Sequence, residues 1–247
     1  MRRLSFVVAV VAAGCASANI GAGSPPDGNP GGSDSLNAPP IDGADVDAAL
    51  PIDAAVSVTL NESGSSAVAA TQIACQDGTT SFTAENSYYR IFPLADSGIT
   101  APFHVTEVTF AVERATAGNG VSQPAQVKLG TYTGVLNAGT FAVSQITPLA
   151  SATIQIPQNA TLVTTPIAMF SPATLTIAPG TLLAAEVFIP DGRPAGNIFY
   201  LGSNAGTETH PSYIRAPDCS VLSPTSYDTA VGTTPAVRIL LTVTGTH

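Results

Sequence analysis

Several kinds of residue are scarce in this chain of 247 residues, and each scarcity excludes a class of protein. Tryptophan is absent, and charged residues make up only 10% of the sequence, with a formal net charge of −9. Beyond residue 54 the only lysine is Lys128 and no basic cluster occurs, so nucleic acid is not an expected partner. The first apolar run is shorter than the ~20 residues of a membrane-spanning helix, and Pro or Gly interrupts every later one.

Catalytic motifs are missing as well. The three histidines, His104, His210 and His247, form no H-x-x-x-H or H-E-x-x-H pair, so the sequence has no zinc signature. In residues 202–206 the serine is misplaced for a G-x-S-x-G nucleophile elbow. We therefore predict no catalytic residues and a protein that is not an enzyme. A Ser-His-Asp set assembled from distant residues stays open as a minor alternative.

Carboxylates permit two further hypotheses, both less favoured. Paired acids facing one cleft would indicate a glycoside hydrolase. The acids on expected strands are Glu107, Glu113 and Glu186. Solvated glutamates on outer strand faces are the simpler interpretation. Calcium would need loop oxygens, which Asp191, Asp218 and Asn204 offer without a D-x-D-x-D run. We expect no metal and no cofactor.

The first fifteen residues carry an export signal. Arg2 and Arg3 precede a short apolar run, which is the shape of a secretory signal peptide. Its end, Ala12-Ala13-Gly14-Cys15, resembles the lipobox of bacterial lipoproteins, although that family usually has leucine where Ala12 stands. The resemblance implies a signal peptide over residues 1–14 and lipid attachment at Cys15. It also implies outer-membrane delivery, because the residue after the cysteine is not aspartate.

A second cleavage site keeps an alternative open. Ala16-Ser17-Ala18 has the small residues of an A-x-A site. Cleavage after residue 18 would remove Cys15 and release a secreted soluble protein. Under the lipoprotein interpretation, several acyl chains meet the two-signal requirement for stable membrane anchoring.

Residues 15–54 predict a disordered tether. Residues 19–53 contain six aspartates and no lysine or arginine, and the rest are mostly Gly, Pro, Ala, Ser and Asn. Such a segment has too little apolar surface to offset the entropy lost on ordering. As a flexible coil it would span ~35 Å, enough to hold a folded domain away from a membrane.

Cys75 and Cys219 remain after either cleavage. An exported chain enters an oxidising compartment, where two cysteines have one intramolecular pairing. We therefore predict a Cys75–Cys219 disulfide, with two buried free thiols as the alternative.

Residues 55–247 predict one all-β domain, a single antiparallel β-sandwich that is jelly-roll-like. Segments rich in Thr, Val and Ile alternate apolar and polar residues between Pro and Gly turns, and no convincing helix of ten residues occurs. The expected strands include residues 105–113, 127–131, 153–156, 174–177, 182–189 and 237–244.

Side-chain alternation defines two of these strands in detail. Val108, Phe110 and Val112 share one face, and the apolar residues before them are out of phase, which indicates a bulge near Thr106. In the last strand the expected inward residues are Val237, Ile239, Leu241 and Val243.

Two segments, residues 85–92 and 199–219, hold four of the six tyrosines. Tyrosine faces and arginine forks are common in sugar stacking and carboxylate capture. The predicted disulfide would bring the segments together, so one shared surface is a hypothesis. The candidate binding residues are Asn86, Tyr88, Tyr89, Arg90, Asn204, Tyr213 and Arg215. The favoured alternative is structural, with inward tyrosines and arginines paired to Glu85 and Asp218.

These segments also resemble uncharacterised secreted domains of environmental bacteria, over about residues 70–245. The resemblance implies export and a β-sandwich, with no assigned activity. We therefore expect an exported, lipid-anchored surface protein with a non-enzymatic extracellular binding module for a polysaccharide or a surface protein. The lack of tryptophan argues against carbohydrate. A structural envelope component is the main alternative, and a hydrolase is less favoured.

Overall fold

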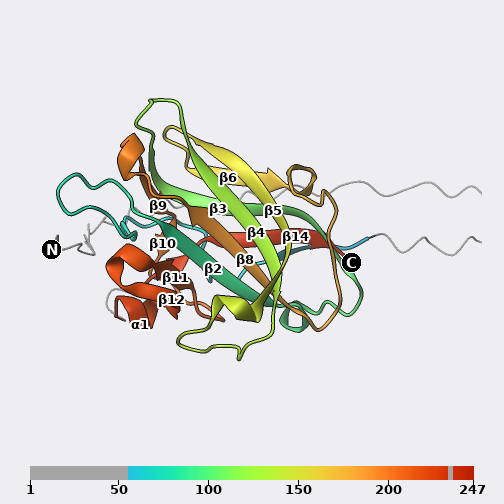
Figure 1. Cartoon of the computed structure of the whole chain (residues 1–247). Helices are drawn as coiled ribbons and strands as arrows, with labels where there is room; N and C mark the ends of the chain where they lie inside the picture. Colours follow the sequence, from blue (N-terminus) through green and yellow to red (C-terminus); the bar gives the residue numbers. More distant parts are fainter. Residues whose placement is uncertain (1–54, 233–235) are drawn as a thin grey trace, which may run out of the picture. The chain divides into compact units, whose positions relative to one another are not determined.

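The computed structural model describes residues 55–232 and 236–247 (Figure 1). The predicted signal peptide (residues 1–14, or 1–18), Cys15 and the tether of residues 15–54 lie outside the described residues. Within the described part, no helix has the length and apolar character needed to cross a membrane. Its helical elements are α1 (Tyr227–Ala230) and the 3-10 turns η1 (Leu94–Ser97), η2 (Val143–Gln145), η3 (Ile167–Met169), η4 (Arg193–Ala195) and η5 (Pro217–Cys219).

The remaining elements are strands. They are β1 (Ser57–Leu60), β2 (Asn86–Pro93), β3 (Phe103–Thr116), β4 (Ser122–Tyr132), β5 (Ile146–Pro157), β6 (Leu162–Pro166), β7 (Thr176–Ile177), β8 (Leu182–Ile189), β9 (Ile198–Leu201), β10 (Ser203–Asn204), β11 (Tyr213–Ala216), β12 (Val221–Ser226), β13 (Arg238–Ile239) and β14 (Leu241–Thr246).

The strands pair antiparallel and form two large sheets. The first, which we call the β2 sheet, has the order β12-β11-β2-β8-β4-β5. The second, the β3 sheet, has the order β1-β14-β3-β6, and β7 and β9 also pair with β3. A short pair, β10 and β13, lies apart from both. The chain crosses repeatedly from one sheet to the other, and the predicted all-β sandwich is confirmed.

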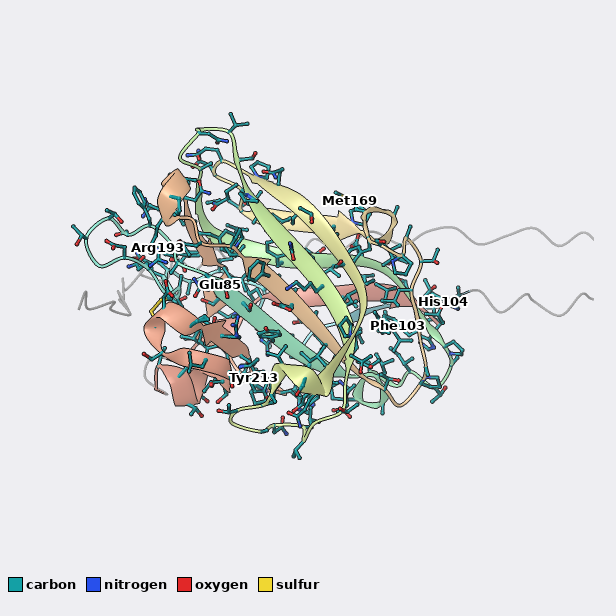
Figure 2. The ribbon with its side chains drawn as sticks, viewed as in Figure 1. Glu85, Phe103, His104, Met169, Arg193 and Tyr213 are labelled. Carbon is teal, nitrogen blue, oxygen red and sulfur yellow. A yellow bond between two sulfur atoms is a disulfide. The ribbon has the colours of Figure 1, made fainter. Side chains whose placement is uncertain are left out.

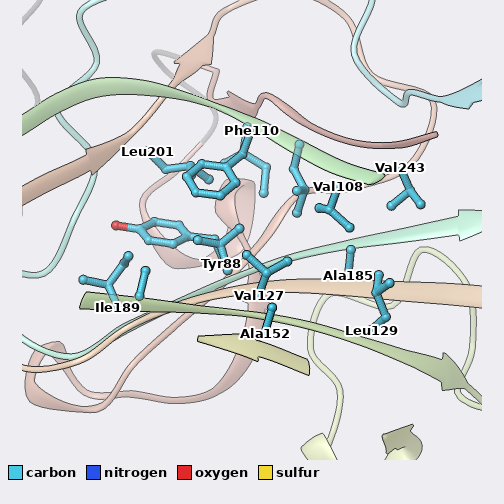
Figure 3. Close-up of a cluster of buried hydrophobic side chains, with 14 of the residues drawn as sticks. Tyr88, Val108, Phe110, Val127, Leu129, Ala152, Ala185, Ile189, Leu201 and Val243 are labelled. Atoms are coloured by element: carbon cyan, nitrogen blue, oxygen red, sulfur yellow. The ribbon is translucent and has the colours of Figure 1, made fainter. Parts of the chain in front are cut away.

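The inner faces of the two sheets enclose the main hydrophobic core (Figure 3). Tyr88, Val187 and Val127 lie in one row across the β2 sheet, and each is fully buried. Val108 and Phe110 of β3 face them from the other sheet. Alternating β-branched and aromatic residues give each strand one apolar face, and burying such a side chain stabilises the fold by ~1.5–3 kcal/mol.

The predicted bulge in β3 is confirmed at Thr106. Thr244 of β14 pairs with Glu107, whereas the next residue, Gly245, pairs with Val105, which leaves Thr106 as the extra residue. The extra residue changes the phase of the strand, so that residues on both sides of the bulge point into the core.

The last strand is interrupted where the sequence predicted one run. β13 pairs with β10, and β14 pairs with β3 and β1. Between them, the N–H of Leu240 donates to the carbonyl of Gly202 at 2.9 Å, and its carbonyl accepts from the N–H of Ala111 at 2.9 Å. The four predicted inward residues, Val237, Ile239, Leu241 and Val243, are all buried.

A second apolar cluster covers part of the outer face of the β2 sheet. Residues 133–145 connect β4 to β5, and we call this segment the strap. Its Phe141 packs against the rings of Tyr89, Tyr132 and Tyr213, with centroid distances of 5.9, 5.0 and 5.0 Å. Because the core covers one face of β2 and the strap covers the other, all eight residues of β2 are buried.

The predicted disulfide between Cys75 and Cys219 is confirmed (Figure 2). It joins the segment before β2 to η5, which lies between β11 and β12. Residues separated by 144 positions are thereby cross-linked.

Candidate functional site

The two predicted binding segments adjoin through strand pairing. In the β2 sheet, Tyr213 of β11 lies opposite Tyr89 of β2, and Arg215 lies opposite Ser87. The segments are therefore neighbours, but most of their candidate side chains are enclosed by the fold.

Asn86, Tyr88 and Arg90 share the inner face of β2. The Oδ1 atom of Asn86 accepts a hydrogen bond from the N–H of Cys75 at 2.9 Å, and its Nδ2 donates to the carbonyl of Cys75 at 3.1 Å. The hydroxyl of Tyr88 donates to the carbonyl of Ile73 at 3.3 Å. These contacts position the segment that carries the disulfide, so Asn86 and Tyr88 have structural roles.

Arg90 is fully buried inside the sandwich. Its Nη1 donates to Oε2 of Glu208 at 2.8 Å and to the carbonyl of His210 at 2.8 Å, and its Nη2 donates to the carbonyl of Ile239 at 2.7 Å. Burial lowers the pKa of the guanidinium, and the Glu208 carboxylate opposes that shift. Arg90 holds together three segments that are distant in sequence and is not open to a ligand.

The other candidates are buried too, with one exception. Tyr89 and Tyr213 lie on the outer face of the β2 sheet, but Phe141 covers them and each is 2% exposed. Asn204 donates from Nδ2 to the carbonyl of Ser65 at 2.8 Å. The hypothesis of an exposed tyrosine surface is thus contradicted by burial, because six of the seven candidate residues are buried within the described structure.

Arg215 is the exception, with 30% of its side chain exposed. Its Nη1 lies 2.9 Å from Oε1 of Glu85, one of the two acids that the structural alternative named as arginine partners. Asp218, the other acid expected to pair with an arginine, contacts Arg193 instead.

The three acids weighed for glycoside chemistry do not face one cleft. Glu107 lies in the β3 sheet, where it pairs with Pro166 and Thr244, and Glu186 lies on the outer face of the β2 sheet. Glu113 accepts hydrogen bonds from the backbone N–H groups of residues 71 and 72, at 3.0 and 2.9 Å to Oε2. Burial raises the pKa of Glu113, and these hydrogen bonds oppose the shift.

The described histidines have no arrangement that activates a serine. Both ring nitrogens of His210 are engaged, Nδ1 with Oδ1 of Asn137 at 2.8 Å and Nε2 with Oδ2 of Asp96 at 2.8 Å. His104 lies at the opposite end of the domain from Arg193 (Figure 2), and its Nδ1 is 2.9 Å from Oγ1 of Thr176.

The loop oxygens weighed for calcium do not converge. Asp191 accepts two hydrogen bonds from Arg193 at 2.8 Å each, and Asp218 contacts the same guanidinium. Asn204 lies elsewhere, beside residues 63 and 65. Among the described residues, no group of three potential metal ligands occurs.

The outer face of the β2 sheet contains a different site, centred on Lys128. Its Nζ lies 3.2 Å from Oε1 of Glu186 on the neighbouring strand β8 and 4.5 Å from the ring centroid of Phe188. The Lys128 side chain is 37% exposed and that of Glu186 is 15% exposed. An ammonium group that contacts a carboxylate and an aromatic ring still has an N–H left for a ligand.

Two pockets lie on either side of this lysine, and Lys128 and Pro148 line both of them. The inner pocket has a volume of about 190 Å³ and the outer pocket about 250 Å³. We call the two together the Lys128 groove. The inner pocket is lined mainly by Leu129, Gly130, Val143, Ile146, Ala184 and Glu186, and the outer pocket by Gln126, Leu149, Ala150, Ser151 and Ser171.

A β-bulge beside the lysine shapes the groove. Leu129 pairs with Ala150 and Gly130 pairs with Pro148, so Leu149 is the extra residue of β5. A Cβ atom added at Gly130 would lie 2.6 Å from the carbonyl oxygen of Thr147, so only glycine permits this close approach of the strands. Bulges are over-represented beside functional sites because they redirect side chains.

Sequence reasoning missed this groove, although part of its signal was present. The alternation of β4 places Lys128 on the outer face beside Gln126, and Glu186 was expected on an outer face. What the sequence could not supply was the register of β4 against β8, which places Lys128 opposite Glu186.

Comparison with known proteins adds little. No protein-family model matches this chain, and no curated protein matches it significantly. Among solved structures, the chain is similar to the cysteine protease and lectin-like domains of Cwp84, a surface layer associated protein of Clostridium difficile. The TM-score is 0.46 at 11% identity, with 67% of this chain and 33% of that chain covered. We draw no functional argument from a similarity this low.

Proposed function

We propose that this protein is exported and anchored to the cell envelope through Cys15, and that its β-sandwich is a non-enzymatic module that binds polysaccharide in the Lys128 groove. The observation that carries the proposal is the Lys128–Glu186 pair on the outer face of the β2 sheet, where Lys128 lines two pockets and Glu186 lines the inner one. Binding sites built on strands hold their side chains more precisely than sites built on loops.

The chemistry of the groove suits a sugar. Neighbouring hydroxyl groups of a pyranose both donate and accept hydrogen bonds, and here a donor, Lys128, adjoins an acceptor, Glu186. The apolar C–H face of a sugar ring needs an apolar wall, which Pro148 and Val143 supply in place of the missing tryptophan. Apolar walls with a few convergent polar groups are typical of ligand pockets.

A binding role is favoured over hydrolysis for a geometric reason. Hydrolysis of a glycosidic bond needs two carboxyl groups about 5–9.5 Å apart around the scissile bond. The Lys128 groove is lined by one carboxylate, Glu186. That carboxylate is already engaged by a lysine, 3.2 Å from Oε1.

The binding proposal is tested by retention of the oxidised full chain on insoluble cellulose, xylan, mannan, chitin and peptidoglycan. We expect retention on at least one polymer and a loss of at least tenfold in affinity for Lys128→Met, which keeps the apolar stem. The matched control is Arg114→Met, because Arg114 is an exposed cation that lines neither pocket. Retention on none of the polymers would contradict the proposal and favour the structural envelope role.

The anchoring proposal has its own test. In cells of a diderm bacterium, the native chain should fractionate with membranes and gain mass from acyl chains at Cys15. A Cys15→Ser variant should lose both properties. A mature N-terminus at residue 19 would instead establish cleavage at the second site and a soluble secreted protein.

A further inference from the structure

We infer that the Lys128 groove contains two adjacent subsites for consecutive sugar rings of a neutral polysaccharide, with Lys128 at the junction between them. This inference rests on the proposed function, and it specifies the length and charge of the ligand. The chain of sugars would run from β8, across β4, to the edge of β5.

The size of the pockets limits each to a ligand fragment about as small as one sugar ring. At about 190 and 250 Å³, both are smaller than the ~300 Å³ at which pockets for drug-sized ligands begin. Because Lys128 and Pro148 line both pockets, two rings placed in them would be neighbours that share these two contacts. A linear chain of linked rings meets this geometry.

The two pockets differ in chemistry, so the two ends of a bound sugar chain would meet different surroundings. The inner pocket has apolar walls from Val143, Ile146 and Ala184, which suit the C–H face of a ring. The outer pocket is lined by Gln126, Ser151 and Ser171, residues whose amide and hydroxyl groups suit the hydroxyl groups of a sugar. The backbones of Ser151 and Ser171 exchange hydrogen bonds of 3.3 and 2.8 Å, so the wall at the sheet edge is fixed.

The charge of the groove selects a neutral ligand. Glu186 neutralises Lys128 at 3.2 Å, and the other lining residues are uncharged. The formal net charge of the chain is −9, which repels polyanions at a distance. A donor and an acceptor of balanced charge match the hydroxyls of a neutral sugar better than the carboxylates of an acidic one.

The test compares mono-, di- and trisaccharides of the retained polymer by calorimetry with the oxidised full chain. We expect the disaccharide to bind at least tenfold more tightly than the monosaccharide, a difference of 1.4 kcal/mol, and the trisaccharide to add little. Polygalacturonate, an anionic polymer, should not retain the protein.

Each subsite has a variant that should abolish the gain from the second ring. Val143→Asp places a charge in the inner pocket, and Ser151→Leu removes a hydroxyl from the outer pocket and fills it. Both residues are exposed, so the midpoint of urea unfolding should be the same for each variant as for the unmodified protein. The matched control is Thr153→Leu, an exposed residue two positions along β5 that lines neither pocket.

The outcomes separate the inference from the proposed function. Equal affinity for one and two rings, with Lys128-dependent retention of the polymer, would overturn the two-subsite inference and leave the binding module intact. Preferred retention on polygalacturonate would overturn the neutral specificity. Retention on no polymer would contradict both the two-subsite inference and the proposed binding function.

Discussion

At the residue scale, the most unusual side chain is a buried arginine. Arg90 follows two tyrosines in β2, and the charges near it are Glu208, Glu62 and Arg238. Glu208 receives hydrogen bonds from Arg90 and Ser212 on one oxygen, and its other oxygen lies 3.2 Å from Arg238. A buried charge persists only when it is paired, and these contacts supply partners for both terminal nitrogens of Arg90.

Arg90→Met should therefore destabilise the fold strongly. The substitution leaves the carbonyls of His210 and Ile239 without the Arg90 donor and removes a cation from half-buried Glu208. We expect a loss of ~3–5 kcal/mol in the free energy of unfolding, measured by urea titration. The control Arg114→Met, at an exposed arginine 6.0 Å from the ring centroid of Tyr200, should lose less than ~1 kcal/mol. Similar losses for both variants would contradict a structural role for Arg90.

The tyrosines predict how stability changes in alkali. Burial raises the pKa of all six, and for Tyr213 it raises the pKa to about 12. A tyrosine with a raised pKa in the folded state favours the neutral form, so its stabilisation is complete below pH ~10 and is lost as pH rises toward the folded value.

Urea titrations from pH 8 to 12 should show a falling free energy of unfolding above pH ~10. Tyrosinate absorbance should appear together with unfolding. Tyr213→Phe removes one of the titrating groups and should make the fall shallower. Tyrosinate formation at pH 10 in a protein that stays folded would show that these rings are accessible.

At the element scale, the strap determines which side chains on the outer face of the β2 sheet are covered and which are exposed. Its backbone is bonded to β12, because the N–H of Phe141 donates to the carbonyl of Pro224 at 3.0 Å and the N–H of Ser226 donates to the carbonyl of Gly139 at 2.8 Å. Phe141 then covers the tyrosines at one end of the face, and the Lys128 groove occupies another part of it, with Val143 of the strap as one wall.

Phe141→Ala should expose the aromatic cluster on this face. Phe141 is 5% exposed and contacts three tyrosine rings, so its removal should cost ~3–5 kcal/mol of unfolding free energy and reduce the near-ultraviolet circular dichroism of the tyrosines. The control Val135→Ala changes a strap residue that is 74% exposed and should alter stability by less than ~0.5 kcal/mol. Equal effects of the two would mean that the strap does not pack on the sheet as described.

The strap also explains which elements could be predicted from the sequence. β8 was predicted with its observed bounds, and the bulge at Thr106 was predicted from a change of phase, because each has a clear inward face. The same reasoning from alternation did not work for β2. Both of its faces are covered, and the covering residue, Phe141, is about fifty positions away in sequence. The hypothesis of a tyrosine surface failed here, whereas the favoured structural alternative held, because alternation along one strand indicates one buried face and gives no sign of a second covering.

At the scale of the whole molecule, the fold depends on contacts between distant parts of the chain. β2 pairs with β8 and β11, so that Tyr89 lies between Glu186 and Tyr213. Contacts of such sequence separation cost loop-closure entropy before they stabilise the fold, which predicts slow folding. The disulfide lowers this loop-closure entropy cost, because it holds the segment before β2 near the turn between β11 and β12 even in the unfolded chain.

Removal of the disulfide should therefore lower stability mainly through the unfolded state. For a sequence separation of 144 residues, the chain-entropy model gives a loss of up to ~5 kcal/mol in the double variant Cys75→Ala/Cys219→Ala. The native circular dichroism spectrum should stay unchanged, while the dependence of unfolding free energy on urea should steepen, because the uncrosslinked chain exposes more surface when unfolded. Wild-type protein reduced with a strong thiol reagent should match the double variant. If the variant lost stability with an unchanged urea dependence and an altered native spectrum, the bond would act on the folded state, and its role would be to position the segment that Asn86 also holds.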